Sequence, residues 1–183
     1  MYKQDVFRKI TYTIFYPKDM KLTVHENPET LQQRLRALKK LKSAKVKVGL
    51  PASAGGRLQL ILAVQEHGSP IMHIPSRPVI APALARPETR TAMAEEMQNA
   101  LQAAWEGKDF HPALEAAGQA GADGIRAYID AGISPPNSPV TVSGGWIWNR
   151  PGRKAVYVKG KGMNKPLFDT GALYNAFGYE VED

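Results

Sequence analysis

Apolar residues recur at helical spacing in the first part of the chain. Segment 27–43 (NPETLQQRLRALKKLKS) begins with Asn and Pro, which favour a helix N-terminus, and carries a leucine every three or four residues. This spacing predicts an amphipathic helix with one buried stripe. The stripe consists of Leu31, Leu35, Leu38 and Leu41. A shorter helix is predicted over 57–66, ending at His67 and Gly68.

Two longer helices are predicted in the middle of the chain. The first begins at Pro87 and stops at Gly107, and we expect its apolar face in the core. That face consists of Met93, Met97, Leu101, Ala104 and Trp105. The second spans 111–132, and its core residues are Leu114, Ile125 and Ile129. Its glycines each cost about 1 kcal/mol relative to Ala in a helix interior, so another element should pack closely there. They are Gly118, Gly121 and Gly124.

Alternating apolar and polar residues predict the strands. Residues 10–24 indicate two short strands broken at 17–19, and AKVKVGLP (44–51) places Val46 and Val48 on one side of a third. The proline-dense stretch 69–87 cannot hold a long regular element. The predicted fold is α/β of the α+β type: a small, mainly antiparallel sheet packed against the two longer helices.

The residues after Ile133 have a different character. We expect a loop over 133–145 and then a projecting β-hairpin, with strands GWIWN and KAVYV and a turn at 151–152. Trp146 and Trp148 would share one face. Cations gather in this basic loop and hairpin, 134–165, which contains no acid: Arg150, Arg153, Lys154, Lys159, Lys161 and Lys165. A capped short helix and a closing strand near 179–182 end the chain.

Length and composition narrow the class of protein. A chain of 183 residues with 43% hydrophobic and 22% charged residues is expected to fold as one domain, 1–183, with a real core. With no cysteine, disulfides and thiolate metal sites are excluded. Neither a membrane-spanning apolar run nor a secretory signal is found, so we expect synthesis in the cytoplasm and no membrane partner. The net charge of +7 favours attraction to nucleic acid or acidic proteins.

The tripeptide Asp169-Thr170-Gly171 resembles the catalytic segment of an aspartic protease. Such an enzyme needs two carboxylates sharing one proton, and its small form needs a strand-rich domain after the tripeptide. Only twelve residues follow Gly171, and they predict a helix and a strand. We therefore interpret Asp169 as the cap of the helix that begins at Thr170.

Other candidate chemistry is equally weak. Glu66, His67 and His73 match no common metal-ligand spacing, and VKGKGMNKP lacks the pattern of a phosphate-binding loop. The chain has neither the Ser, His and Asp order of a known hydrolase nor a Gly-x-Ser-x-Gly segment that would present a nucleophile. We expect no catalytic residue, no metal and no cofactor. DNA binding stays open as an alternative, because the hairpin joins positive charge to the aromatic residues Trp146, Trp148 and Tyr157. Tryptophans on a hairpin also build cores and protein interfaces.

Several segments, taken in order, resemble the tail-completion or head–tail joining proteins of tailed bacteriophages, also called virion morphogenesis or minor tail proteins. They are KVKVGLP, LAVQEHGSP, IPSRPVIAPAL, a long helix, SPPNSPVT and KPLFDTGALYNAFGYEVE. The matching motif residues are Glu66 and Gly68, then Arg77 and Pro78, and finally Asp169, Thr170 and Gly171. In that family the Asp-Thr-Gly is structural.

The resemblance covers about residues 44–183. It departs from the family at His67, where an aromatic residue is usual, and at the Trp-rich hairpin, which replaces a shorter linker; residues 1–26, an arm or pair of strands, lie outside it. It implies a non-enzymatic structural protein of the virion, located at the head–tail junction. Several copies would form a ring that contacts neighbouring neck, head-closure, adaptor or tail proteins and, incidentally, genomic DNA. We expect the hairpin 145–159 to be the interaction arm.

Overall fold

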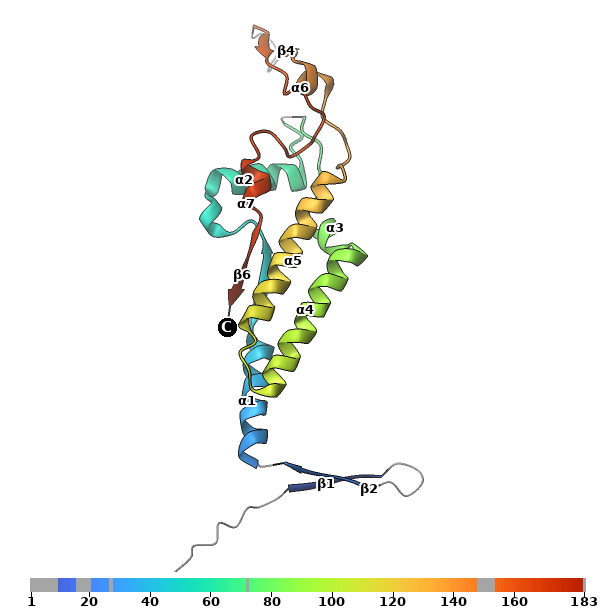
Figure 1. Cartoon of the computed structure of the whole chain (residues 1–183). Helices are drawn as coiled ribbons and strands as arrows, with labels where there is room; N and C mark the ends of the chain where they lie inside the picture. The colour runs from blue at the N-terminus through green and yellow to red at the C-terminus, as the bar shows by residue number, and fades with distance from the viewer. Residues whose placement is uncertain (1–9, 16–20, 27, 72, 148–153, 183) are drawn as a thin grey trace, which may run out of the picture.

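Two long helices form the centre of the molecule (Figure 1). The computed structural model describes residues 10–15, 21–26, 28–71, 73–147 and 154–182. Helix α4 (Pro87–Glu106) runs down one side and α5 (His111–Asp130) returns beside it. Gly107 ends α4 in the left-handed conformation (φ 73°), and its N–H donates to the carbonyls of Ala103 and Ala104. The predicted bounds of both helices are confirmed within two residues.

A two-stranded antiparallel sheet packs on α5. It pairs β3 (Lys45–Gly49) with β6 (Gly178–Glu182), and the register joins Val46 to Val181 and Val48 to Tyr179. The helix glycines permit the close approach. A Cβ on Gly121 would lie 2.9 Å from Val48, and one on Gly124 would lie 2.3 Å from Thr89 of α4. The predicted close packing at these glycines is confirmed.

The buried side chains form two clusters. One joins α5 to the elements at its C-terminal end and consists of Leu62, Val79, Ala83, Ile125, Ile129, Ile133, Leu173 and Phe177. The other lies where α4 turns into α5 and consists of Ala100, Ala104, Phe110 and Leu114. Helix α1 (Pro28–Ser43) covers the second cluster through Leu38 and Leu41. The predicted core residues of α5 are confirmed.

Two predicted apolar faces are only partly buried. On α1, Leu35 is exposed, whereas the other three leucines are half-buried. On α4, Ala104 is buried and Met93 half-buried, but three bulky residues of the expected core face are exposed: Met97, Leu101 and Trp105. The reason is that small residues, Ala100 and Ala104 with Thr89, make the buried face of α4.

Short helices surround the C-terminal end of α5. They are η1 (Ala52–Ala54), α2 (Gly56–His67), α3 (Ile80–Ala85), α6 (Pro139–Ser143) and α7 (Ala172–Ala176). Helix α6 corrects the expected loop over 133–145. Its N-terminus forms because Ser138 accepts a hydrogen bond from the Thr141 N–H at 3.3 Å.

Two β-hairpins extend from opposite ends of the molecule (Figure 1). Strands β1 (Ile10–Phe15) and β2 (Lys21–Glu26) pair antiparallel before α1. Strands β4 (Gly145–Ile147) and β5 (Val156–Val158) form the predicted hairpin, shorter than expected, and its turn lies outside the described residues. The fold class is confirmed as mixed α+β and mostly helical, with antiparallel strand pairs throughout the part of the chain described.

Candidate interaction surface

The β4–β5 hairpin presents an aromatic pair to solvent. Its register places Trp146 opposite Tyr157, and the two rings meet edge to face with centroids 5.5 Å apart. Trp146 is 67% exposed and Tyr157 57%, and Val156 beside them is also exposed. Rings that contact each other yet stay this exposed are not core residues, so the alternative that Trp146 builds the core is not supported.

Helix α6 holds the base of the hairpin. The backbone N–H groups of Lys161 and Gly162 donate to the carbonyls of Thr141 and Val142, both at 2.9 Å. The two chain segments approach so closely that a Cβ on Gly160 would lie 2.4 Å from the Gly144 nitrogen. The hairpin is therefore fixed at its base by backbone contacts, and its aromatic residues face outward.

Cations accompany the aromatic pair. Lys154 and Lys159 are exposed, and the Lys161 Nζ lies 3.7 Å from the Asp169 carboxylate. Three other predicted interaction residues lie outside the described residues: Trp148, Arg150 and Arg153. The prediction that Trp146 and Trp148 share a face is therefore neither confirmed nor contradicted.

Arg77 ties the segment before the hairpin to α2. The guanidinium is buried and donates from Nε to the Pro135 carbonyl (2.7 Å) and from Nη2 to the Pro136 carbonyl (3.0 Å). Its Nη1 donates to the Gln65 side chain at 3.2 Å. Burial lowers the pKa of Arg77 from its usual value, but an arginine keeps its charge at neutral pH. Arg77 thus has a structural role.

Glu66 and Gly68 shape the turn that follows α2. The Glu66 carboxylate accepts the backbone N–H groups of Val79 and Ile80, each at 2.9 Å, and so caps α3. Gly68 has φ 74°, and a Cβ there would lie 2.8 Å from the Ser76 nitrogen. Pro78, exposed, leads into the fully buried Val79.

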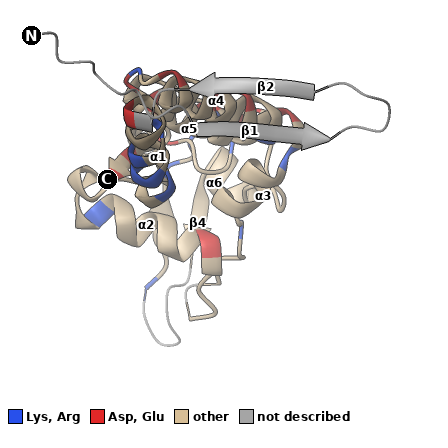
Figure 2. Ribbon diagram, turned by 90° about the horizontal axis from the view of Figure 1, so that it is seen from below, with Lys and Arg blue, Asp and Glu red and all other residues tan. Residues whose placement is uncertain are grey.

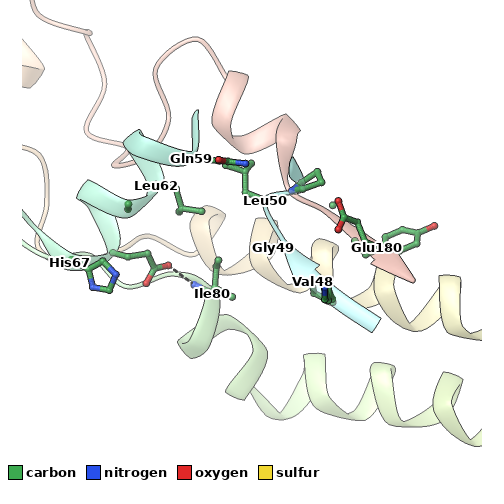
Figure 3. Close-up of a pocket in the computed structure, with 14 residues that line it drawn as sticks. Val48, Gly49, Leu50, Gln59, Leu62, His67, Ile80 and Glu180 are labelled. Atoms are coloured by element: carbon green, nitrogen blue, oxygen red, sulfur yellow. Dashed lines mark hydrogen bonds between the residues drawn. The ribbon is translucent and has the colours of Figure 1, made fainter. Parts of the chain in front are cut away.

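Glu66 and His67 line a hollow of about 410 Å³ beside β3 (Figure 3). The Glu66 carboxylate is engaged in the cap, and the described residues contain no group of three or more His, Asp or Glu side chains placed to hold a metal ion.

The cap assigned to Asp169 is wrong. Helix α7 begins at Ala172, and it is the Thr170 hydroxyl that accepts the Ala172 N–H at 3.3 Å. The Asp169 carboxylate points instead toward Lys161. Gly171 precedes α7 in the left-handed conformation (φ 81°), which explains a glycine at this position.

A groove of about 950 Å³ brings the hairpin and the motif segments together. Arg77, Asp169, Thr170 and Gly171 lie along it. Its apolar lining comes from α2, α6, both strands of the hairpin, α7 and the segment leading into α7: Ile61, Val140, Ile147, Val158, Leu167 and Leu173. Segments that are far apart in the sequence therefore form one surface at this end of the molecule.

Sequence reasoning missed a second exposed surface, because it assigned the residues to the core. These residues are Leu35 on α1 and Met97, Leu101 and Trp105 on α4. One signal was available: the alanines of α4, among them Ala100 and Ala104, can supply a small-residue face for helix packing, so the bulky residues need not lie in the core.

Comparisons with protein-family models, with curated proteins and with solved structures found no match to this chain. Among its described residues, no helix combines the length and apolarity needed to cross a bilayer.

Proposed function

We propose that the protein is a non-enzymatic structural component of a tailed-bacteriophage virion. It acts at the head–tail junction, where several copies form a ring that joins the DNA-filled head to the tail. The β4–β5 hairpin is the arm by which each copy contacts its neighbours. Synthesis takes place in the host cytoplasm, and the finished ring belongs to the virion.

The observation that carries this proposal is the exposed Trp146–Tyr157 pair at one end of the molecule. Tryptophan and tyrosine are enriched among the residues that dominate protein–protein binding energy. Lys154 and Lys159 stand beside the pair, where they can meet acidic groups of a partner.

The motifs of the phage resemblance add support, because they contact one another. Arg77 binds the carbonyls of Pro135 and Pro136, Glu66 caps α3, and the Asp169–Gly171 segment lines the same groove as Arg77. If the chain shares the fold of that phage family, its motif residues should build one structural unit.

Deletion of the gene from the parent phage tests the proposal. We expect negative-stain electron microscopy of the lysate to show full heads and finished tails that have not joined, or tails without a proper upper end. Wild-type protein supplied from a plasmid should restore joined particles. Intact particles in normal numbers without the gene would contradict the joining function.

A DNA-binding function is the second candidate, and the same aromatic pair with its lysines favours it. Salt separates the two functions. Phosphate contacts make affinity fall by about one log unit per log unit of salt for each phosphate neutralised. Fluorescence anisotropy with a labelled oligonucleotide measures this slope, and a flat dependence would exclude the DNA-binding function.

A further inference from the structure

The positive charge of the chain is concentrated in one segment. Residues 34–47, which run from α1 into β3, contain seven of the 24 Lys and Arg residues and no acid. The rest of the chain is left with 17 Lys and Arg residues against 17 Asp and Glu residues, so this segment accounts for the whole net charge of +7. Figure 2 shows Lys and Arg residues gathered on α1.

Part of this charge is neutralised inside the chain. Lys47 forms an ion pair with Glu182 across the β3–β6 sheet, and Lys45 stands opposite Glu182 in the strand register. The exposed cations on the solvent side of α1, in contrast, form no ion pair with any residue that the structure describes. They are Arg36, Lys39 and Lys40, here called the cationic face.

The cationic face weakens the helix that carries it. Lys39 and Lys40 follow Arg36 by three and four residues, and like charges at these spacings are neighbours that destabilise a helix. The one acid of α1, Glu29, lies about 10 Å from Arg36 along the helix axis. The helix dipole favours cations only in the last turn, which includes Lys40 but neither Arg36 nor Lys39. The stability of α1 therefore does not explain this arrangement.

The residues beside the cationic face indicate which anion it suits. Gln32 and Gln33, both exposed, lie one turn earlier on the same side of α1. The core of a protein interface is enriched in aromatic residues and depleted of lysine, whereas contacts to a nucleic-acid backbone use Lys, Arg and Gln side chains. A helix on a lipid surface buries an apolar face in the membrane, but Leu38 and Leu41 of α1 pack against the core of this chain. Phosphodiester groups are thus the anions that fit the cationic face.

We propose that the cationic face of α1 binds the phosphate backbone of a nucleic acid without sequence preference. Its three cations bind phosphates by charge and release condensed counterions, and the neighbouring glutamine amides donate hydrogen bonds to phosphate oxygens. Helix α1 and the β4–β5 hairpin lie at opposite ends of the molecule (Figure 1), so this site is separate from the hairpin. The inference goes beyond the joining function, which requires no contact with nucleic acid.

Fluorescence anisotropy with a labelled DNA duplex of mixed sequence tests the proposal on the full-length protein. Arg36→Gln/Lys40→Gln should weaken binding roughly 10- to 100-fold at about 0.1 M salt. The slope of log affinity against log salt should become shallower by about two, because two phosphate contacts are lost.

The matched control is Arg57→Gln/Arg90→Gln. It removes the same amount of charge from exposed positions on α2 and α4, away from the cationic face. Its affinity for the duplex should stay close to that of the unaltered protein. Equal losses of affinity in the two double variants would overturn the inference, because binding would then follow net charge and not a site.

A stability measurement separates phosphate binding from a structural role. Arg36→Gln/Lys40→Gln removes a repulsion between neighbours, so this variant should melt at the same temperature as the unaltered protein or at a higher one. Reduced affinity would then come from lost phosphate contacts in a folded protein. A clearly lower melting temperature would overturn the inference, because the cations would then serve the fold.

Other surfaces and other anions are tested in the same way. No binding to the duplex at low salt, or a loss of affinity confined to Lys154→Gln/Lys159→Gln of the hairpin, would overturn the inference. Vesicles of phosphatidylserine and phosphatidylcholine test a lipid partner. If Arg36→Gln/Lys40→Gln weakens binding to these vesicles but not to the duplex, the cationic face belongs to a lipid surface and the inference fails. None of these results decides the joining function, which gene deletion tests separately.

Discussion

Tyr179 of β6 lies directly on Gly118 of α5, where a Cβ would stand only 2.5 Å from the carbons of the tyrosine ring. The sheet can approach the helix this closely only because Gly118 has no side chain. Gly121 repeats the arrangement one turn later against Val48 of β3. The two glycines therefore set the spacing between the sheet and α5.

Gly118→Ala should destabilise the protein by about 1–3 kcal/mol, the usual cost of an overpacked core. Urea unfolding followed by circular dichroism measures the difference. Gly56→Ala is the matched control: Gly56 also lies in a helix, and a Cβ there meets nothing within 4 Å. It should be neutral or slightly stabilising. Equal unfolding midpoints for Gly118→Ala and the unaltered protein would contradict the packing described.

Arg77→Lys should destabilise by about 2–3 kcal/mol, because one ammonium cannot replace three separate N–H donors. Thermal unfolding gives the size of the loss. Limited proteolysis should also show faster cleavage near Pro135 and Pro136, whose carbonyls lose their donors. Arg90→Lys, at an exposed position, serves as the control. An unchanged proteolysis pattern would show that Arg77 does not hold this segment.

Asp130 should contribute stability that acid removes. Its carboxylate accepts from Lys165 Nζ (2.6 Å) and Tyr174 Oη (2.7 Å), and these bonds hold the pKa of Asp130 below its usual value. A carboxyl group whose pKa is lower in the folded protein than in the unfolded chain stabilises the fold at pH values above its unfolded pKa, which is about 3.9 for aspartate. This contribution disappears as the pH falls through the lower pKa of the folded protein.

Unfolding free energies of the unaltered protein and of Asp130→Asn, measured from about pH 7 to pH 3, check this prediction. The difference between them should shrink at the acid end. Tyr174→Phe removes one of the two hydrogen bonds to Asp130. The difference in unfolding free energy between this variant and the unaltered protein should also shrink at acid pH, but by a smaller amount. A difference that stays constant with pH would refute the assignment.

Thr170→Val should destabilise by about 0.5–1.5 kcal/mol, because the Ala172 N–H loses its acceptor. Asp169→Asn should leave both stability and particle assembly unchanged, since its ion pair with Lys161 is long and exposed. Chemical unfolding of the two variants side by side distinguishes them. Loss of assembly in Asp169→Asn alone would assign that carboxylate a functional role.

Trp146→Ala should leave a folded protein that does not assemble, because the ring is exposed in the single chain. Near-ultraviolet circular dichroism and thermal unfolding test the fold, and native mass spectrometry tests assembly. A large loss of thermal stability would mean that Trp146 supports the core after all.

Local signals in the sequence located most helices and strands. Pro87 and Gly107 fixed both ends of α4, because proline suits a first helical turn and glycine adopts the left-handed conformation that ends a helix. The glycines of α5 predicted close neighbours, although not that β6, β3 and α4 would provide them.

Burial was harder to predict than secondary structure. Spacing alone identified an apolar line through Met97, Leu101 and Trp105, but periodicity cannot tell an apolar line that the chain buries from one that it leaves exposed. The prediction that Asp169 caps the last helix was wrong because both Asp169 and Thr170 can accept a backbone N–H. Only the path of the backbone decides which of them does so.

The pairing of β3 with β6 has a consequence for protein synthesis. Residues 135 positions apart in the chain, Lys47 and Glu182, meet across this sheet. Helices α4 and α5 are neighbours in sequence and can pair while translation continues, since local contacts form fast. Strand β3, in contrast, waits on the nascent chain with the backbone N–H and C=O groups of its edge unpaired until the ribosome has delivered β6. During that interval the unpaired edge of β3 is open to aggregation, and a chaperone has reason to hold it.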